Sequence, residues 1–264
     1  MNWKKLTLPD GQPPAALTVG LMIFMTFMYL LNLAFGLNDH IILKPNSLFK
    51  LDLNRISLYP LAHLSVIHLS LNAFSLFGPL TMFERTHGTV HTAIMLNLLA
   101  VTTAILYCLI GSLLFPNVDV AGSSGWCFSL FAYYSVKESV LRPTQRIVST
   151  YSFPTIYIPV VLLLLITIIV PGSSFWGHFL GMIMGYVLAF KESIFCKLAP
   201  PSSLVIKIET KLDRLINLIP LGVKYYREQE ADRSLEYASI FHSEDVLPIH
   251  NNENFQGQGR ALGA

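Results

Sequence analysis

Gly122-Ser123-Ser124-Gly125 stands where a hydrophilic connection meets an apolar helix, and Gly177-His178-Phe179-Leu180-Gly181 opens the last apolar stretch of the same chain. A serine held in a turn between glycines and a histidine are the minimum parts of a nucleophilic hydrolase. Both lie in segments apolar enough for a lipid bilayer, where a polar group is costly unless it has a partner or a function. The two stretches together predict peptide-bond chemistry carried out within a membrane.

The composition is that of a membrane protein throughout. The 264 residues are 53% hydrophobic and only 13% charged, whereas a soluble domain carries about 25% charged residues. A net charge of +2, without a basic patch interleaved with aromatic residues, excludes nucleic acid as the expected partner. The three cysteines have no metal or redox spacing, so we expect free thiols and neither metal nor cofactor.

Six apolar stretches predict an all-α, polytopic membrane protein with a six-helix bundle over residues 16–190. The first is longer than the core of a signal peptide, so we expect it to remain as the first helix. The second, fourth and sixth are shorter or more polar than a lipid-facing helix, which favours shelter inside the bundle or beside water. The six ranges are 16–37, 61–80, 91–115, 124–136, 155–170 and 174–190.

The distribution of Lys and Arg predicts that both termini are cytosolic. Lys44, Lys50 and Arg55 are the cations of the long first loop, and the connections on the other side carry more. Cytosolic loops carry the excess of basic residues. Residues 1–15 are then a cytosolic N-terminal segment, and residues 191–264 are a cytosolic tail. The cations assigned to the cytosolic side are Lys4, Lys5, Arg85, Lys137, Arg142, Arg146, Lys191 and Lys197.

The tail contains a candidate amphipathic helix over about residues 203–219, followed by a stretch from about 228 to 264 that we expect to be disordered. The helix could lie on the cytosolic surface of the lipid bilayer or pack onto the end of the bundle. Its apolar residues at helical spacing are Leu204, Ile208, Leu212, Leu215 and Ile219.

Four polar residues from three spans are expected in one layer on the lumenal side. His68 and Asn72 share a helix face at positions i and i+4, about 10 and 17 Å below Leu61 at 1.5 Å per residue. Ser124 lies in the first turn of the fourth span, and His178 lies about one turn into the sixth.

The chemistry of these side chains suggests their roles. Ser124 is the expected nucleophile, flanked by Gly122 and Gly125, and His178 is the expected general base and then general acid. His68, Asn72 and the backbone N–H of Ser124 are expected to stabilise the oxyanion. No acidic residue lies in the sixth span, so the sequence predicts a dyad and not a triad.

These residues resemble the rhomboid intramembrane serine proteases, over about residues 50–190. The likeness rests on His63-x4-His68-x3-Asn72, on Gly122-Ser123-Ser124-Gly125, and on Gly177-His178-x2-Gly181-x3-Gly185. It implies the six-helix rhomboid fold, with the serine and histidine as the dyad and the second-helix His and Asn in the oxyanion hole. Flanking phrases such as Tyr59-Pro60-Leu61 are most similar to fungal Golgi members, which implies a Golgi membrane.

The resemblance also assigns supporting positions. Arg55 matches the family's first loop, and Glu84 matches the turn after the second helix. His63 is expected to support the site from behind it, and Gly181 and Gly185 to allow close packing of the sixth helix on the fourth. Two positions depart from the family pattern. Asn54 stands where a tryptophan is frequent, and Phe128 stands where a tyrosine supports the histidine ring. Phe128 still offers a face for stacking but no hydroxyl.

The predicted function is cleavage of single-span membrane proteins near their lumenal membrane boundary. The alternative is a non-catalytic adaptor, similar to Derlins, that delivers membrane clients to a valosin-type AAA+ segregase. Residues 255–262 favour such a partner because they resemble the short F-x-G-x-G-x-x-L motif that recruits this segregase. The matching positions are Phe255, Gly257, Gly259 and Leu262. Both roles could coexist in one protein, with the tail choosing clients and the bundle cutting them.

Overall fold

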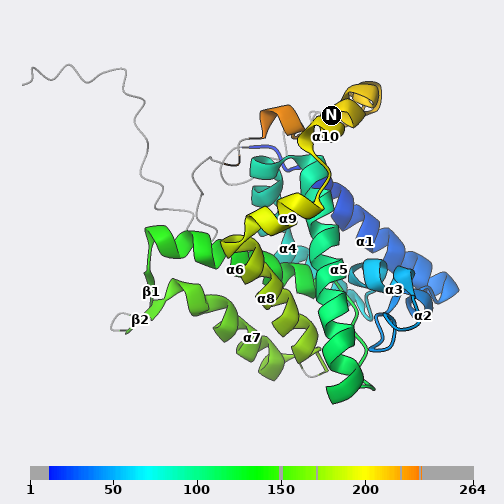
Figure 1. The fold of residues 1–264 in the computed structure, drawn as a ribbon, viewed down its shortest axis with the longest axis vertical. Coiled ribbons are helices and arrows are strands. Elements are labelled where there is room, and N and C mark those ends of the chain that lie inside the picture. The colour runs from blue at the N-terminus through cyan, green and yellow to red at the C-terminus, as the bar shows by residue number, and fades with distance from the viewer. Residues whose placement is uncertain (1–11, 149–150, 171, 221, 232, 234–264) are drawn as a thin grey trace, which may run out of the picture.

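The computed structural model describes residues 12–148, 151–170, 172–220, 222–231 and 233, and it is mainly helical (Figure 1). Six longer helices fall where the sequence predicts apolar spans. They are α1 (Ala16–Phe35), α4 (Val66–His87), α5 (Thr89–Leu114), α6 (Ser124–Leu141), α7 (Ile158–Ile169), which the 3₁₀ turn η2 (Thr155–Tyr157) precedes, and α8 (Phe175–Phe190).

Three helices in the described part of the chain are long and apolar enough to cross a membrane: α1, α4 and α5. A fourth span is possible if α8 is joined to α9 (Glu192–Leu198) across a 95° bend. Helix α6 ends in a more polar turn that contains Lys137 and Glu138, and α7 has only 12 residues. The chain therefore has the apolar helices of a multi-pass membrane protein.

Helix α6 is central. It contacts α4, α5, α7 and α8, and its buried residues include the polar Ser129, Ser135 and Glu138. By contrast, large apolar side chains such as Ile23, Phe27 and Phe74 on α1 and α4 are exposed. An apolar exterior around a partly polar core is the pattern expected of a bundle surrounded by lipid. We call the end of the bundle where α4, α6 and α8 begin the Ser124 end, and the opposite end the His87 end.

Helix α4 begins later than the sequence predicts. Its apolar range was expected to start at Leu61, but Tyr59–Leu61 form the 3₁₀ turn η1 and Ser65 caps the helix by accepting a hydrogen bond from the His68 N–H. A serine N-cap satisfies one of the free N–H groups of a first turn. His68 and Asn72 therefore lie nearer the helix end than the predicted 10 and 17 Å.

The long connection between α1 and α4 is ordered and contains α2 (Asn38–Ile41) and α3 (Leu53–Leu58). Arg55 ties its parts together: it pairs with Asp52 at 2.7 Å and donates to the carbonyls of Ile42 and Asp39. These bonds show that Arg55 stabilises the fold of this loop.

A short hairpin that the sequence did not predict joins α6 to η2. Strands β1 (Thr144–Val148) and β2 (Tyr151–Pro154) pair antiparallel, with an irregularity between Arg146 and Val148. The hairpin lies at the His87 end of α6, away from the nucleophile turn (Figure 1).

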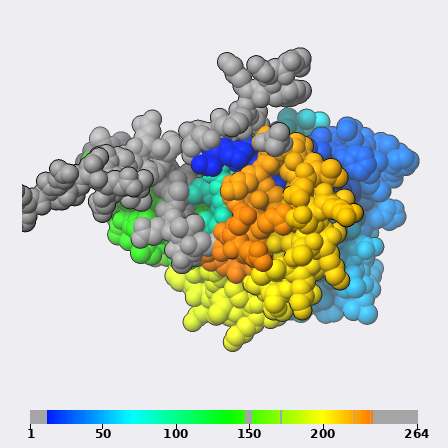
Figure 2. Space-filling view, turned by 90° about the horizontal axis from the view of Figure 1, so that it is seen from above, coloured from blue at the N-terminus to red at the C-terminus, as the bar shows by residue number. Residues whose placement is uncertain are grey.

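The tail folds back over the His87 end, where α10 (Ser202–Lys211), α11 (Asp213–Ile216) and η3 (Glu228–Glu230) form a layer beside the start of α1 (Figure 2). Backbone bonds fasten it: Lys224 N–H donates to Pro14 at 2.9 Å, and Thr89 N–H donates to Tyr226 at 2.8 Å. The predicted disorder from residue 228 is therefore wrong for Glu228–Glu230, because contacts distant in sequence order them.

The predicted amphipathic helix is broken into α10 and α11. Val205 and Glu209 are its buried residues, and the Glu209 carboxylate accepts bonds from Tyr225 Oη and the Glu228 N–H. The predicted apolar row, in contrast, stays exposed at Leu204 and Ile208. Packing onto the bundle thus centres on Val205 and Glu209, and the apolar residues Ile208, Leu212, Leu215 and Ile219 line a hollow beside Val90 of α5.

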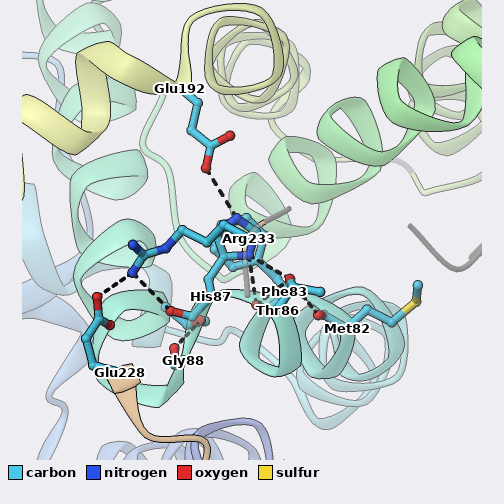
Figure 3. A network of polar contacts seen from close by, with 9 residues as sticks. Met82, Phe83, Thr86, His87, Gly88, Glu192, Glu228 and Arg233 are labelled. Atoms are coloured by element: carbon cyan, nitrogen blue, oxygen red, sulfur yellow. Dashed lines mark hydrogen bonds and ion pairs between the residues drawn. The ribbon is translucent and has the colours of Figure 1, made fainter. Parts of the chain in front are cut away.

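A polar network joins α4, α9 and the tail at the His87 end (Figure 3). His87 Nε2 lies 3.3 Å from Glu192 Oε1, and Arg233 bonds both Glu228 and the His87 carbonyl. The hydrogen bond from His87 lowers the pKa of Glu192. The His87 ring stacks on Phe83 with centroids 3.8 Å apart. The network fixes the far ends of α4 and α8 relative to each other.

Glu84 anchors α1, whose own N-cap residue makes no side-chain cap. The fully buried Glu84 carboxylate accepts from the N–H groups of Leu17 and Thr18 at 2.8 and 2.9 Å, and from the hydroxyls of Thr18 and Thr89. A carboxylate at a helix N-terminus satisfies free N–H groups and complements the helix dipole.

We expect Glu84→Ala to lower the free energy of unfolding by about 3 kcal/mol, because it leaves buried donors without an acceptor. Denaturant titration of the purified protein measures this. The exposed Glu230 supplies the control Glu230→Gln, which should change stability little. Equal stability of the two variants would refute the anchoring role.

Candidate active site

The Ser124 hydroxyl and the His178 imidazole meet in the structure. Ser124 Oγ and His178 Nε2 are 2.8 Å apart. Ser124 is the first residue of α6, and His178 lies in the first turn of α8, whose N-cap Ser174 accepts from the Gly177 N–H at 3.2 Å. Two helix starts thus place a nucleophile and a base within hydrogen-bonding reach.

Phe128 holds the face of the histidine ring. The two rings are stacked with centroids 4.8 Å apart and an interplanar angle of 28°. His178 Nδ1 is buried and has no hydrogen-bond partner among the described residues. In a triad, a carboxylate bonded to Nδ1 orients the imidazole. Here the stacked Phe128 ring orients it instead.

Donors converge beside the nucleophile turn. Gly122 adopts φ +100°, and a Cβ at this position would lie 2.6 Å from His68 Nε2 and 3.0 Å from Asn72 Nδ2. Asn72 Nδ2 is buried without a hydrogen-bond partner among the described residues. The first N–H groups of α6 also lack partners inside the helix. The site thus collects free donors next to the hydroxyl, as an oxyanion requires.

Comparison with known proteins identifies the family to which this arrangement belongs. The model of the rhomboid domain matches residues 50–194, which is more than half of the chain. The chain belongs to the rhomboid family of serine proteases. It is 54% identical to rhomboid-type serine protease 2 of Saccharomyces cerevisiae over 96% of this chain and 97% of that protein. It is 55% identical to rhomboid-type serine protease 2 of Kluyveromyces lactis over the full length of both.

Family membership makes this rhomboid an integral, multi-pass membrane protein with serine protease activity. The predicted resemblance is therefore confirmed. The four polar residues predicted to share a layer also lie together, around Gly122 and the start of α6.

His63 and Ser123 lie behind the Ser124–His178 pair of this rhomboid. Both are fully buried, and Ser123 Oγ lies 3.5 Å from His63 Nε2. His63 Nδ1 is 3.2 Å from the Leu61 carbonyl, which can only accept, so Nδ1 carries the proton and Nε2 accepts from Ser123. The sequence suggested support by His63 but missed Ser123, which occupies the variable position of a Gly-x-Ser-Gly turn.

We expect Ser123→Ala to lower kcat about fivefold, because it removes one hydrogen bond that holds the nucleophile turn. The measurement is steady-state cleavage. Ser139→Ala is the control, since within the described part of the chain the Ser139 hydroxyl bonds the Val136 carbonyl of its own helix. An unchanged kcat in Ser123→Ala would show that the turn does not need this bond.

Glycines bring α8 onto α6. A Cβ at Gly181 would lie 2.7 Å from the Gly125 carbonyl oxygen, and one at Gly185 would lie 2.0 Å from that of Ser129. The Ser129 hydroxyl also donates across the contact to the Gly181 carbonyl at 2.7 Å. Ser129 was not predicted, although its position four residues after Gly125 places it on the same helix face.

Two predicted supporting residues lie outside this cluster. Arg55 binds carbonyls of the first loop, and Glu84 binds the start of α1 at the His87 end. They stabilise the helices and the loop around the site and do not contact Ser124 or His178. The tail positions Phe255, Gly257, Gly259 and Leu262 lie outside the described residues.

Proposed function

We propose that this rhomboid is an intramembrane endopeptidase in which Ser124 and His178 form a catalytic dyad. The single observation that carries the proposal is the 2.8 Å contact between Ser124 Oγ and His178 Nε2. A non-catalytic, Derlin-like adaptor has no use for an aligned nucleophile and base, so the geometry favours the enzyme.

The dyad works by acyl transfer. His178 Nε2 takes the hydroxyl proton as Ser124 Oγ attacks the scissile carbonyl carbon, and the negative charge moves to the carbonyl oxygen. The C–N bond then breaks, and His178 gives the proton to the leaving amine. Water, deprotonated by the same nitrogen, hydrolyses the acyl-enzyme and restores the serine.

In this proposal, Asn72, His68 and the Ser124 N–H bind the oxyanion. The unpaired Asn72 Nδ2 and His68 Nε2 both lie beside Gly122. His68 Nε2 is a donor when it carries a proton. Preorganised donors cost no reorganisation as charge develops, and losing one typically costs about 10²–10³ in kcat. Gly122 keeps open the space that these donors need.

The substrates we propose are single-span membrane proteins, cut near the lumenal boundary. The site lies at the helix starts at the Ser124 end, so it is shallow relative to the length of α4. Few cations lie at this end, and Lys137, Arg142 and Lys191 lie toward the other. This supports cytosolic termini and a lumenal site under the positive-inside rule. The likeness of flanking phrases such as Tyr59-Pro60-Leu61 to fungal Golgi members supports a Golgi membrane.

Mapping the cut tests this proposal. A single-span substrate is reconstituted with the protein in vesicles, and the product termini are identified by mass spectrometry. We expect cleavage near the lumenal end of the span, enhanced by a helix-breaking Gly-Pro pair there, because an intact helix hides its carbonyls. Cleavage confined to the cytosolic boundary would contradict the proposed orientation.

We also propose that residues 255–262 recruit a valosin-type AAA+ segregase. The spacing of Phe255, Gly257, Gly259 and Leu262 supports this, because glycines allow a chain to bind a partner in an extended form and Phe255 and Leu262 supply apolar anchors. Deleting residues 255–262 should abolish co-purification of the segregase and leave cleavage by the purified protein intact. Undiminished binding would refute the motif.

A further inference from the structure

A hollow of about 430 Å³ lies between α1 and α5 in the half of the bundle nearest the His87 end. It opens on the exterior of the helix bundle. In Figure 1, α1 lies on one side of α5, and α7 and α8 lie on the other. The lining residues belong to α1 and α5, whereas Ser124 and His178 belong to α6 and α8. The lining residues are Leu17, Thr89, Val90, Ala93, Ile94, Asn97 and Leu98.

Asn97 is the unusual member of this lining. Its side chain is exposed on a membrane helix, and its amide has no hydrogen-bond partner among the residues that the structure describes. It lies eight residues after Thr89, which is about 12 Å along the helix at 1.5 Å per residue. At this depth lipid offers neither donors nor acceptors, so an unpaired amide is costly.

The open face of α5 is suited to close approach by another helix. Ala93, one turn before Asn97, is also exposed, and small side chains let helix backbones come together in membranes. Further along the same face, Cys108 and Gly111 are covered by the first loop, through Lys44 and Pro45. A second helix can therefore touch α5 around Ala93 and Asn97 and must diverge toward the Ser124 end.

We infer that this face binds a second copy of the chain, with the two Asn97 side chains hydrogen-bonded to each other. Copies inserted in the same orientation hold Asn97 at the same depth, with a two-fold axis along the membrane normal. An amide is both donor and acceptor, so two of them satisfy each other reciprocally. A lipid chain cannot do this, and a substrate helix would need its own polar group at that level.

Energy transfer between donor- and acceptor-labelled protein, diluted stepwise with lipid in vesicles, tests the inference. We expect Asn97→Leu to weaken self-association about tenfold and Asn97→Gln to retain it. Leu109→Ala, at an exposed position on another face of α5, is the control and should associate as the wild type does. Cleavage by Asn97→Leu should stay at the wild-type rate, which separates this inference from the proposed activity and excludes misfolding.

A cysteine cross-link locates the contact. In a Cys196→Ser background, which removes the exposed native thiol, Ala93→Cys should form a disulfide-linked dimer and Leu109→Cys should not. A protein that stays monomeric on dilution, self-association unchanged in Asn97→Leu, or no disulfide-linked dimer through position 93 would overturn the inference.

Discussion

Ser124→Ala and His178→Ala are each expected to slow cleavage of a reconstituted single-span substrate by at least about 10³-fold. The first variant removes the oxygen proposed to attack, and the second removes the imidazole whose Nε2 lies 2.8 Å from it. Because the two groups act as one unit, the double variant should be hardly slower than either single variant. Initial rates of product formation in vesicles measure the effect.

Matched controls separate chemistry from folding. Ser139 lies on the same helix as the nucleophile, and His40 is exposed in the first loop, so Ser139→Ala and His40→Ala should keep wild-type rates. All variants should unfold at a denaturant concentration close to that of the wild type. A Ser124→Ala protein that still cleaves at a comparable rate would show that another residue is the nucleophile.

Gly185→Ala is expected to have the largest effect on stability. The new Cβ would lie 2.0 Å from the Ser129 carbonyl oxygen. The atoms it meets belong to the backbone of α6, so a change of side-chain rotamer cannot relieve the clash. Helices α6 and α8 must separate, at a cost of about 3 kcal/mol or more. Since these helices carry Ser124 and His178, cleavage should fall as well. Thermal unfolding and cleavage rates measure both effects.

The control for this prediction is Gly20→Ala. Gly20 is also helical, but a Cβ there meets nothing within 4 Å, so the substitution should be neutral or slightly stabilising through its better helix propensity. Gly181→Ala, with its closest contact at 2.7 Å, should fall between the two. Similar unfolding midpoints for Gly185→Ala and Gly20→Ala would contradict the close approach of α8 to α6.

The sequence predicts the helices of the bundle and the reacting pair well, because both depend on local signals. Apolar length marks each helix. Ser124 follows the Gly122 turn, and His178 follows Gly177 in the first turn of α8. The stacking of Phe128 on His178 could also be anticipated, since position i+4 from Ser124 faces the same way.

Contacts that depend on distant segments could not be predicted. Glu84 binds the N–H groups of Leu17 and Thr18, which lie 67 and 66 residues away. No sequence motif or periodicity links positions this far apart. The order at Glu228 likewise depends on Glu209 and Arg233. The late start of α4 was missed because Leu61 and Ala62 are apolar enough to continue a helix, and only the Ser65 cap shows where it begins.

Mass-spectrometric mapping of an electrophilic phosphonate probe on the purified protein tests the central claim most directly. The hydrogen bond between Ser124 Oγ and His178 Nε2 predicts a single adduct on Ser124, and its formation should be slowed by about 10³-fold or more in His178→Ala. An adduct on another residue, or labelling of Ser124 at the same rate without the imidazole of His178, would contradict the dyad.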